Sequence, residues 1–366
     1  MDEGGVLLRI AIVGCGQIAD AHIQEIRRIP GATVEAVCDV NYHMAEQAAA
    51  RFQVPRLYTD LGRMLGDVRP DVVHVTTPPR SHLPIARMLA EQGAHAYIEK
   101  PFTATAAEAE ELVDCATRAG VLACVGHCNA YDSAFLRLRR LCDEGHLGDV
   151  VHVDTVMGYN LAGPFGAVMM GDPTHWVHDL PGGIAQNNIS HPLSLLLPFL
   201  PDERPVVSAL GQRCRPARYG DARDRFFDEI RVTLLGSRGT ASLQFSSRVR
   251  PPQMYATVHG TKAYATASLD SRTLRLVHGA SMPGPFARVQ WAYRDRHEAA
   301  REFRRNLAAL VRAELHFFEG MHELIRRFYL AIQGKQEMPV PMAEALRATR
   351  ILEEIFTQCD RRAEEA

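Results

Sequence analysis

The stretch that decides the fold is LLRIAIVGCGQIA, residues 7–19. Its first half is a short and almost continuously apolar run, which is typical of a strand buried in a parallel sheet. Gly14, Gly16 and Ala19 then form a GxGxxA pattern, where glycines permit a tight turn and let backbone N–H groups approach a pyrophosphate. The stretch therefore predicts a strand, a turn and a helix N-terminus that hold a dinucleotide.

An acidic residue at the end of the next predicted strand strengthens this interpretation. Asp39 lies about 20 residues after the turn, where a carboxylate can accept both ribose hydroxyls. It would repel a 2′-phosphate, and Val40 and Asn41 supply no arginine to neutralise one. We therefore expect NAD rather than NADP, with a purely structural glycine-rich turn as the alternative. The cofactor-binding residues predicted from this region are Gly14, Gly16, Gln17, Ile18 and Asp39.

Short apolar runs alternate with longer amphipathic stretches through residues 7–125, which predicts a doubly wound parallel sheet. The predicted strands are residues 7–13, 32–38, 71–76, 94–99 and 121–126. The predicted helices are residues 18–28, 42–52, 82–92 and 106–119, the last after a capping box formed by Thr105 and Glu108. The fold class predicted here is α/β, with a Rossmann domain over residues 1–127.

The pattern changes after residue 127 and predicts a second α/β domain, residues 128–366, with a mainly antiparallel open sheet. We expect helices near 131–143 and 183–197, a strand near 150–159, and several strands between 204 and 277. The tail is helical, with apolar residues at steps of three and four between charged ones. Its arginines are expected to form a solvated face. Whether residues 290–331 make an oligomer contact or close the site is left open.

Composition limits the classes of function. A net charge of −2 gives no electrostatic reason to invoke nucleic acid, and 46% hydrophobic residues suffice for two cores. The sequence contains no apolar stretch long enough for a membrane span and no targeting pattern at its start, so we expect a cytoplasmic protein. Eight scattered cysteines without CxxC pairs predict neither a disulfide framework nor a zinc ribbon, and no metal site is expected.

Several motifs follow one another in a characteristic order: GxGxxAxxH at residues 14–22, TTPPxSH at 76–82, EKP at 99–101, and Gly126-His127. Together they resemble the glucose-fructose oxidoreductase, inositol dehydrogenase and rhizopine-catabolism (Gfo/Idh/MocA) family. The resemblance spans essentially the whole chain. It implies an NAD-dependent oxidoreductase, a homodimer or homotetramer assembled through the open sheet, and sugar, inositol or nucleotide-sugar substrates.

The motifs at strand ends also have a physical rationale, because ligands of parallel sheets bind at the carboxyl edge. Thr76, Thr77, Pro78, His82, Glu99 and Lys100 are predicted to line the cofactor crevice. Lys100 is also the predicted catalytic residue. Its ammonium would be disfavoured beside a nicotinium ring, and it can donate to the reacting hydroxyl oxygen. Pro101 is expected to follow a cis bond, as it often does in the family.

The resemblance places an Asp and a His four residues apart on the helix after Gly182-Gly183. Here His191 matches, whereas Asn187 occupies the Asp position. His191 is predicted as the general acid or base, with a structural histidine as the alternative. Asn187 would position substrate or ring by hydrogen bonds, and asparagine there resembles the branch that oxidises nucleotide sugars at C3. Pro192 predicts a kink or a new helix start at this point.

Other residues are predicted to contact a sugar ring by stacking or hydrogen bonds, with a structural role as the alternative. They are Tyr159, Asn160, His175, Trp176 and Asn188. The predicted reaction is hydride transfer between a carbinol carbon and NAD. Two other functions stay open: a redox-neutral enzyme that oxidises a sugar transiently and recycles its NAD, and a non-catalytic protein that binds NAD or sugar.

Overall fold

The protein is described here by a computed structural model that covers residues 7–365, with side chains through residue 361. Residues 1–6, in which the sequence predicts no targeting signal, lie outside this range. The contacts divide the chain into two compact units. The first unit comprises the residues up to Cys128 and Met321–Glu353, and the second comprises Asn129–Gly320 and the residues from Glu354 on. The C-terminal segment Met321–Glu353 thus belongs with the N-terminal part of the chain.

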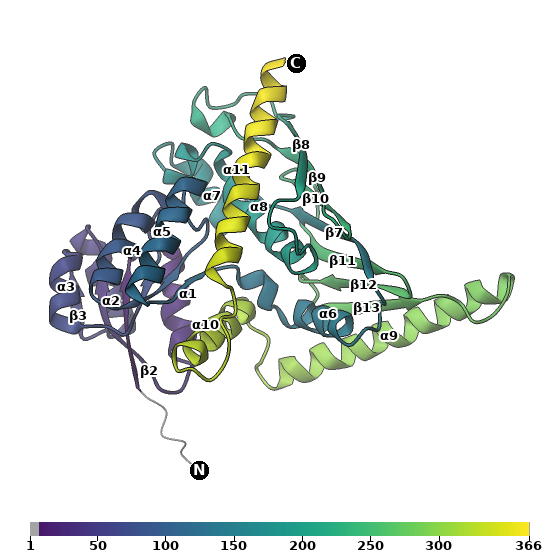
Figure 1. The fold of residues 1–366 in the computed structure, drawn as a ribbon, viewed down its shortest axis with the longest axis horizontal. Helices are drawn as coiled ribbons and strands as arrows, with labels where there is room; N and C mark the ends of the chain where they lie inside the picture. Colours follow the sequence, from purple (N-terminus) through teal and green to yellow (C-terminus); the bar gives the residue numbers. More distant parts are fainter. Residues whose placement is uncertain (1–6, 366) are drawn as a thin grey trace, which may run out of the picture. The chain divides into compact units, whose positions relative to one another are not determined.

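The first unit is built on a six-stranded sheet whose paired strands all run parallel, in the order β3-β2-β1-β4-β5-β6, of which β2 and β3 are labelled in Figure 1. The strands are β1 (Leu8–Val13), β2 (Ala32–Cys38), β3 (Arg56–Tyr58), β4 (Val72–Val75), β5 (His95–Ile98) and β6 (Ala123–Val125). Four of these strands consist almost wholly of buried apolar side chains, as expected where both faces of a sheet are covered. This sheet confirms the predicted Rossmann fold.

Helices connect these strands. They are α1 (Gln17–Ile26), α2 (Tyr42–Phe52), α3 (Leu61–Val68), α4 (His82–Glu91) and α5 (Ala106–Ala119), with a short 3₁₀ turn at Pro79–Ser81. The strand order reverses between β1 and β4, so right-handed crossovers put α1 and α2 on one face and α4 and α5 on the other. The predicted capping box is present in part: Thr105 Oγ1 accepts from the Glu108 N–H, but Glu108 accepts from the N–H of Ala104, one residue before the cap, instead of from that of Thr105.

The second unit is built on a seven-stranded sheet in the order β13-β12-β11-β7-β10-β9-β8. Only β10 and β7 pair in parallel among these strands, so the sheet is mainly antiparallel, as predicted. Its strands are β7 (Val150–Gly158), β8 (Val206–Gln212), β9 (Glu229–Leu235), β10 (Thr240–Ser246), β11 (Met254–Gly260), β12 (Ala263–Ser268) and β13 (Thr273–His278).

One face of this sheet carries a buried helix and the other is more open. The helix α8 (Gly183–Leu196) contacts β7, β10 and β11, and side chains alternate between buried and partly exposed along these strands. The helix α6 (Ser133–Asp143) contacts β12 and β13. The second unit also contains a short helix, α7 (Pro164–Gly171), and 3₁₀ turns at Trp176–Asp179, Leu197–Phe199 and Ala222–Asp224, and a further 3₁₀ turn, Cys128–Tyr131, lies at the boundary between the two units in the sequence.

The predicted helical tail consists of three helices, α9 (Pro285–Val311), α10 (Glu319–Ile332) and α11 (Met342–Glu365). The apolar residues of these helices differ in how far they are buried. Leu324, Ile325 and Phe328 of α10 are fully buried, whereas Phe303 and Leu307 of α9 are 66% and 47% exposed. The periodicity predicted amphipathic helices correctly, but it could not tell which apolar face is covered within one chain.

Three local expectations need correction. The sequence predicted no strand at β3 and no helix at α3, because both are short and only partly apolar. It predicted only a loop before the Gly182-Gly183 turn, where α7 begins with Pro164 at its first turn. The new helix start expected as one alternative at Pro192 is absent, since α8 runs through this residue as one helix from Gly183 to Leu196; the kink expected as the other alternative stays a prediction. Within residues 7–365 no helix is long and apolar enough to cross a bilayer.

Candidate functional site

The turn after β1 brings the chain as close as possible to the end of β4. Gly14 has φ +91°, and a Cβ on it would lie 2.7 Å from Thr77 Cγ2 and 2.9 Å from the Thr76 carbonyl carbon and oxygen. Gly16 differs, because a Cβ there would meet no heavy atom within 4 Å. Gly14 is therefore required by packing inside the protein, whereas Gly16 leaves open space above the turn into which a ligand could fit.

The donors and the carboxylate predicted for a dinucleotide lie together at this turn. No side chain caps the N-terminus of α1 at Gly16, so the first-turn N–H groups of Gln17 and Ile18 face outward with the positive end of the helix dipole. Asp39 accepts from the backbone N–H of Cys15 at 2.7 Å and from that of Asn41 at 2.8 Å. The Asp39 carboxylate is thus fixed beside the glycine-rich turn. These residues fit NAD, which needs donors for its phosphates and an acceptor for a ribose.

The end of β4 is tied to the same turn. Thr76 Oγ1 donates to the Gly14 carbonyl oxygen at 2.6 Å, and Ser81 Oγ donates to Thr77 Oγ1 at 2.7 Å, next to Pro78. The two ring nitrogens of His82 lie 2.8 and 2.9 Å from the carbonyl oxygens of Thr77 and Phe102. Burial lowers the pKa of His82, and a neutral ring can donate to only one of these oxygens. His82 therefore connects the two strand-end loops through the backbone.

The end of β5 carries a cluster of buried or partly buried titratable groups. The Lys100–Pro101 peptide bond is cis, as expected. Glu99 is 8% exposed, and its Oε1 lies 2.9 Å from His22 Nε2. Burial lowers the pKa of Lys100, and the charge of Glu99 raises it in part. Burial also lowers the pKa of His127, after β6, to about 4, so this ring is neutral.

Sequence reasoning missed two residues that complete this cluster. His74 Nδ1 lies 2.7 Å from His22 Nδ1, and His74 Nε2 lies 2.7 Å from the hydroxyl of Tyr329 on α10. His22 stood in the quoted motif without a role. The one available signal for His74 was a polar residue in an otherwise apolar strand, and the sequence offered no signal for Tyr329.

In the second unit, α8 places two predicted site residues on one face. Asn187 and His191 are four residues apart in this helix, which aligns their side chains. Asn187 is 7% exposed, and its Nδ2 lies 3.9 Å from Met169 Sδ. The neighbouring Asn188 donates to the Ile184 carbonyl oxygen at 2.8 Å and is hydrogen-bonded to the hydroxyl of Tyr159. Burial raises the pKa of Tyr159 to about 12.

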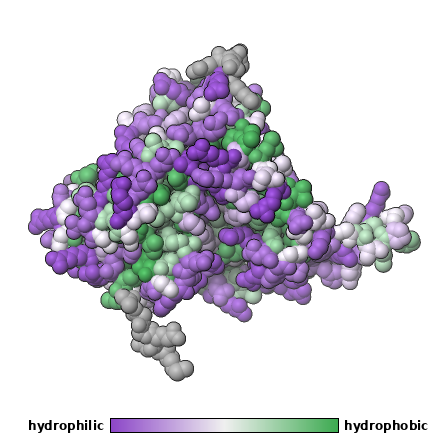
Figure 2. All heavy atoms as spheres, in the orientation of Figure 1, coloured by the Kyte–Doolittle hydropathy of each residue, from purple (hydrophilic) through white to green (hydrophobic). Residues whose placement is uncertain are grey.

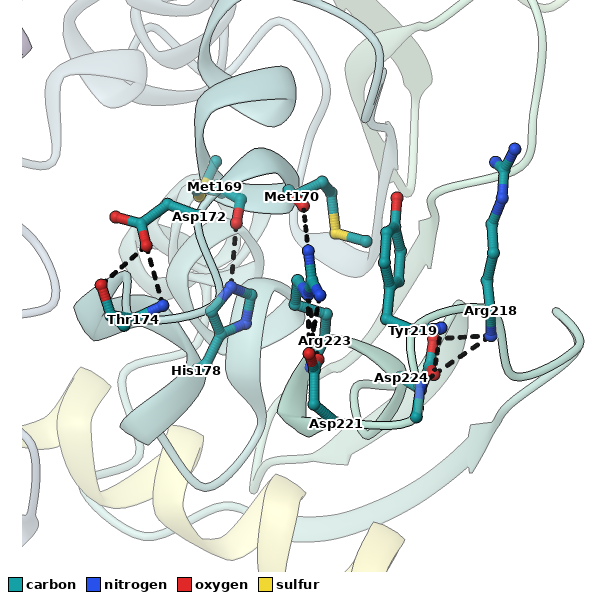
Figure 3. Close-up of polar contacts among 11 residues, drawn as sticks. Met169, Met170, Asp172, Thr174, His178, Arg218, Tyr219, Asp221, Arg223 and Asp224 are labelled. Carbon is teal, nitrogen blue, oxygen red and sulfur yellow. Dashed lines mark hydrogen bonds and ion pairs between the residues drawn. The ribbon is translucent and has the colours of Figure 1, made fainter.

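The remaining predicted substrate residues lie in the segments around α7. Asn160 lies two residues after the end of β7 and accepts from the Ala162 N–H at 3.1 Å. The rings of His175 and Trp176 lie 5.3 Å apart, and the Nδ1 of His175 accepts from the Val177 N–H at 3.2 Å. His178 contacts the Met169 carbonyl oxygen at 2.8 Å (Figure 3). These two histidines are therefore held by the local backbone.

The loop formed by residues 218–224 also contacts the end of α7. Arg223 forms an ion pair with Asp221 at 2.7 Å and donates to the Met170 carbonyl oxygen, toward which it points in Figure 3. Asp224 accepts from the backbone N–H groups of Arg218 and Tyr219. These contacts connect residues 218–224 to the end of α7, within the second unit.

The structure thus brings the predicted cofactor residues together in the first unit, and Asn187, Asn188, His191 and Tyr159 onto or beside α8 in the second. Among the residues whose side chains are described, no group of three or more His, Cys, Asp or Glu side chains is arranged to hold a metal ion.

Comparison with known proteins agrees with this geometry. The profile described as "Oxidoreductase family, NAD-binding Rossmann fold" matches residues 8–127, and the "GFO/IDH/MocA C-terminal domain" profile matches residues 135–266. The chain belongs to the Gfo/Idh/MocA oxidoreductase family. Its first unit is therefore the NAD-binding Rossmann domain of that family, and its second unit contains the family's C-terminal domain.

Two curated proteins are similar to this chain in sequence over part of their length. The D-apiose dehydrogenase of Paraburkholderia graminis is 32% identical over 138 residues, which cover 38% of this chain and 37% of that protein. The D-glucoside 3-dehydrogenase of Escherichia coli is 32% identical over 144 residues, 39% of this chain and 41% of that protein. The chain thus spans about two fifths of the length of these relatives in each match.

A solved structure shows that the fold is shared over nearly the whole chain. The WlbA dehydrogenase from Bordetella pertussis, crystallised with NADH and UDP-GlcNAcA, has a TM-score of 0.76 and 20% sequence identity. The match covers 97% of this chain and 96% of that one. At this identity the similarity establishes the fold alone.

Proposed function

We propose that this chain is an NAD-dependent dehydrogenase that transfers hydride between NAD and a hydroxyl-bearing carbon of a sugar, an inositol or a nucleotide sugar. The observation that carries the proposal is Lys100, a lysine with a lowered pKa that lies at the carboxyl end of β5 in an NAD-binding Rossmann domain. Such strand ends are where this fold binds ligands, and a lysine of lowered pKa releases its proton at lower pH than a free lysine does.

The residues that would hold NAD are those at the glycine-rich turn. Gln17 and Ile18 would donate backbone hydrogen bonds to the phosphates above Gly16, and Asp39 would accept from the ribose. The fixed negative charge of Asp39 supports NAD over NADP. When bound, NAD supplies the hydride acceptor or donor that oxidation or reduction of a carbinol carbon requires.

We assign the proton chemistry to Lys100 and His191. The Nζ of Lys100 would hydrogen-bond the reacting hydroxyl oxygen and stabilise it as negative charge develops. The ring of His191 would take the hydroxyl proton in oxidation or return it in reduction. Asn187 cannot carry the charge of the family's Asp, so it would orient the substrate or the ring by hydrogen bonds.

The substrate class is proposed from the relatives and from the second unit. The curated relatives include enzymes named for apiose, for inositol and for position 3 of a D-glucoside. Tyr159, Asn160, His175, Trp176 and Asn188 offer hydroxyl, amide and ring groups suited to a sugar. Position 3 of the sugar ring is the site of oxidation that we would test first.

We also propose that the chain self-associates, with a second copy covering α9. The exposed apolar residues of this 27-residue helix recur at helical spacing and so form a stripe along it. The N-terminal part of α9 extends past β13 (Figure 1), where Figure 2 shows mainly hydrophilic residues with a few apolar ones among them. The exposed members on or just after α9 are Phe286, Val289, Tyr293, Phe303, Leu307, Leu310, Val311 and Leu315. A stripe of this size on a single chain marks an interaction surface.

Turnover with purified protein tests the dehydrogenase. Wild type should convert one class within a panel of free sugars, inositols and nucleotide sugars with matching change in NADH absorbance. Lys100→Ala should lose at least about a hundredfold in kcat while still binding NAD, within the range that a positioned proton-transfer group contributes. Lys335→Ala, an exposed lysine of the same unit, is the matched control and should keep wild-type turnover.

The outcomes separate the alternatives. Product without net NADH would support a redox-neutral enzyme that recycles its cofactor in place. NAD binding without turnover of any class would support a non-catalytic binding protein. Equal rates for Lys100→Ala and wild type would refute the role assigned to Lys100, and failure to bind NAD would refute the proposal as a whole.

A further inference from the structure

Four buried side chains of the first unit form one continuous hydrogen-bonded chain from α10 to the end of β5. The three contacts are Tyr329 Oη to His74 Nε2 at 2.7 Å, His74 Nδ1 to His22 Nδ1 at 2.7 Å, and His22 Nε2 to Glu99 Oε1 at 2.9 Å. Each of the four residues is less than a tenth exposed. The function proposed above uses only the end of β5, which these hydrogen bonds reach at Glu99, and it gives no role to the two histidines and the tyrosine.

The chemistry at the two ends fixes the direction of every hydrogen bond. An ionised carboxylate can only accept, so Nε2 of His22 must donate to Glu99. A neutral His22 then has a lone pair at Nδ1, which accepts from the Nδ1–H of His74. This leaves a lone pair at Nε2 of His74, which accepts from the hydroxyl of Tyr329. All three contacts are satisfied with no surplus or missing proton.

The opposite direction of the three hydrogen bonds is disfavoured because these side chains are buried. With the same three protons, a protonated Glu99 would leave Tyr329 as a phenolate, whereas burial raises the pKa of the Tyr329 hydroxyl. An extra proton on His22 would force His74 to donate to Tyr329. The tyrosine hydroxyl would then have no acceptor among the described residues, which is costly for a buried donor. Burial also lowers the pKa of His74.

Glu99 is held in one place as well as in one charge state. Its Oε2 accepts from the Lys100 N–H at 3.2 Å, and a Cβ on Gly126 would lie 2.8 Å from its Oε1, so the carboxylate rests against the glycine backbone. The hydrogen bond from His22 lowers the pKa of Glu99 against the effect of burial, and the charge of Glu99 raises the pKa of Lys100. The titratable side chains that face this pair within the unit are His22, His82, Tyr97, His127 and Cys128.

We propose that His22, His74 and Tyr329 are positioning residues that hold Glu99 as an ionised carboxylate in one orientation, next to Lys100, and that this negative charge favours the protonated form of the Lys100 side chain. The part played by Lys100 rests on the function proposed above. The direction of the hydrogen-bonded chain does not, because it concerns the protein without ligand.

The direction can be measured without any activity. In ¹⁵N-histidine NMR spectra of the ligand-free protein between pH 6 and 8, His22 should be the Nε2–H tautomer and His74 the Nδ1–H tautomer. His22→Gln assigns the first ring, and Tyr329→Phe should shift the signal of His74 Nε2. An Nε2–H tautomer at His74, or a doubly protonated His22, would overturn the proposal.

The effect on Lys100 is tested by the pH dependence of kcat. A hydrogen bond to a buried charged group is worth about 1.5–3 kcal/mol, or about 1–2 pH units. His22→Leu should raise the pKa of Glu99 by about that amount. Where this leaves Glu99 uncharged, Lys100 loses the neighbouring negative charge, its pKa falls, and its limb of the profile moves to lower pH. His22→Gln keeps a donor and should restore at least half of the shift.

A double variant separates this role from a purely structural one. Glu99→Gln removes the charge permanently and should give a similar shift, and adding His22→Leu to it should move the profile no further. An additional shift in the double variant would contradict action through Glu99. Correct tautomers in a protein without turnover would refute the proposed dehydrogenase but not the hydrogen-bonded chain, whereas turnover with reversed tautomers would refute the chain alone.

Discussion

Alanine substitutions at Gly14 and Gly16 should separate folding from cofactor binding, because the two glycines meet different surroundings. At Gly14 the backbone has φ +91°, a region that disfavours a Cβ by roughly 1–2 kcal/mol. The new atom would also lie 2.9 Å from the backbone of Thr76, which cannot rotate away. Overpacking of this kind typically costs about 1–3 kcal/mol. We expect Gly14→Ala to destabilise the first unit by about 2–5 kcal/mol.

Gly16→Ala is the matched comparison. Gly16 has φ −74°, and a Cβ there would meet nothing within 4 Å, so the cost to folding is only that of a poorer helix N-cap, up to about 1 kcal/mol. The same methyl group would occupy the space above the turn that we assign to the NAD phosphates. Binding of NAD should therefore weaken by at least about tenfold, or about 1.4 kcal/mol.

Thermal unfolding and calorimetric titration with NAD measure the two effects. For a unit of this size each kcal/mol corresponds to about 2–4 °C, so Gly14→Ala should lower Tm by roughly 4–20 °C and Gly16→Ala by less than about 4 °C. Wild-type affinity for NAD in Gly16→Ala would refute the assigned phosphate position. Equal losses of Tm in the two variants would refute the packing argument for Gly14.

Two further predictions concern the second unit. Burial raises the pKa of Asp132 to about 6 although Arg272 lies 3.6 Å away, so the folded state binds this proton more tightly than the unfolded state. The free energy of unfolding should therefore fall by up to about 3 kcal/mol as pH rises from about 4 to about 6. Asp132→Asn should remove this pH dependence from the unfolding free energies measured by denaturant titration, and an unchanged dependence would contradict the raised pKa. For self-association, replacing Phe303 and Leu307 together by serine should reduce the mass found by sedimentation, whereas Val40→Ser, 94% exposed in the first unit, should not; a monomeric wild type would refute the proposed contact.

Local sequence patterns determined much of the first unit. The predicted helices over residues 42–52 and 106–119 agree with α2 and α5 at both ends. The signals that define these helices are local, because the periodic apolar residues lie within each helix and the capping residues Asn41 and Thr105 directly precede it. The glycine-rich turn and the position of Asp39 followed from the same short-range signals. The boundaries of β3, α3 and α7 did not, since short elements carry too few residues for a periodic pattern.

Long-range packing decided the rest. His74 and Tyr329 are 255 residues apart, and their contact depends on α10 packing with the N-terminal unit rather than with its neighbours in sequence. The same is true of the apolar stripe on α9, whose spacing resembles that of the buried face of α10 although its side chains remain exposed. Periodicity reports which residues share a face of a helix. What covers that face, and which partner satisfies a buried imidazole, is set only by the tertiary structure, because burial and hydrogen bonding depend on groups distant in the sequence.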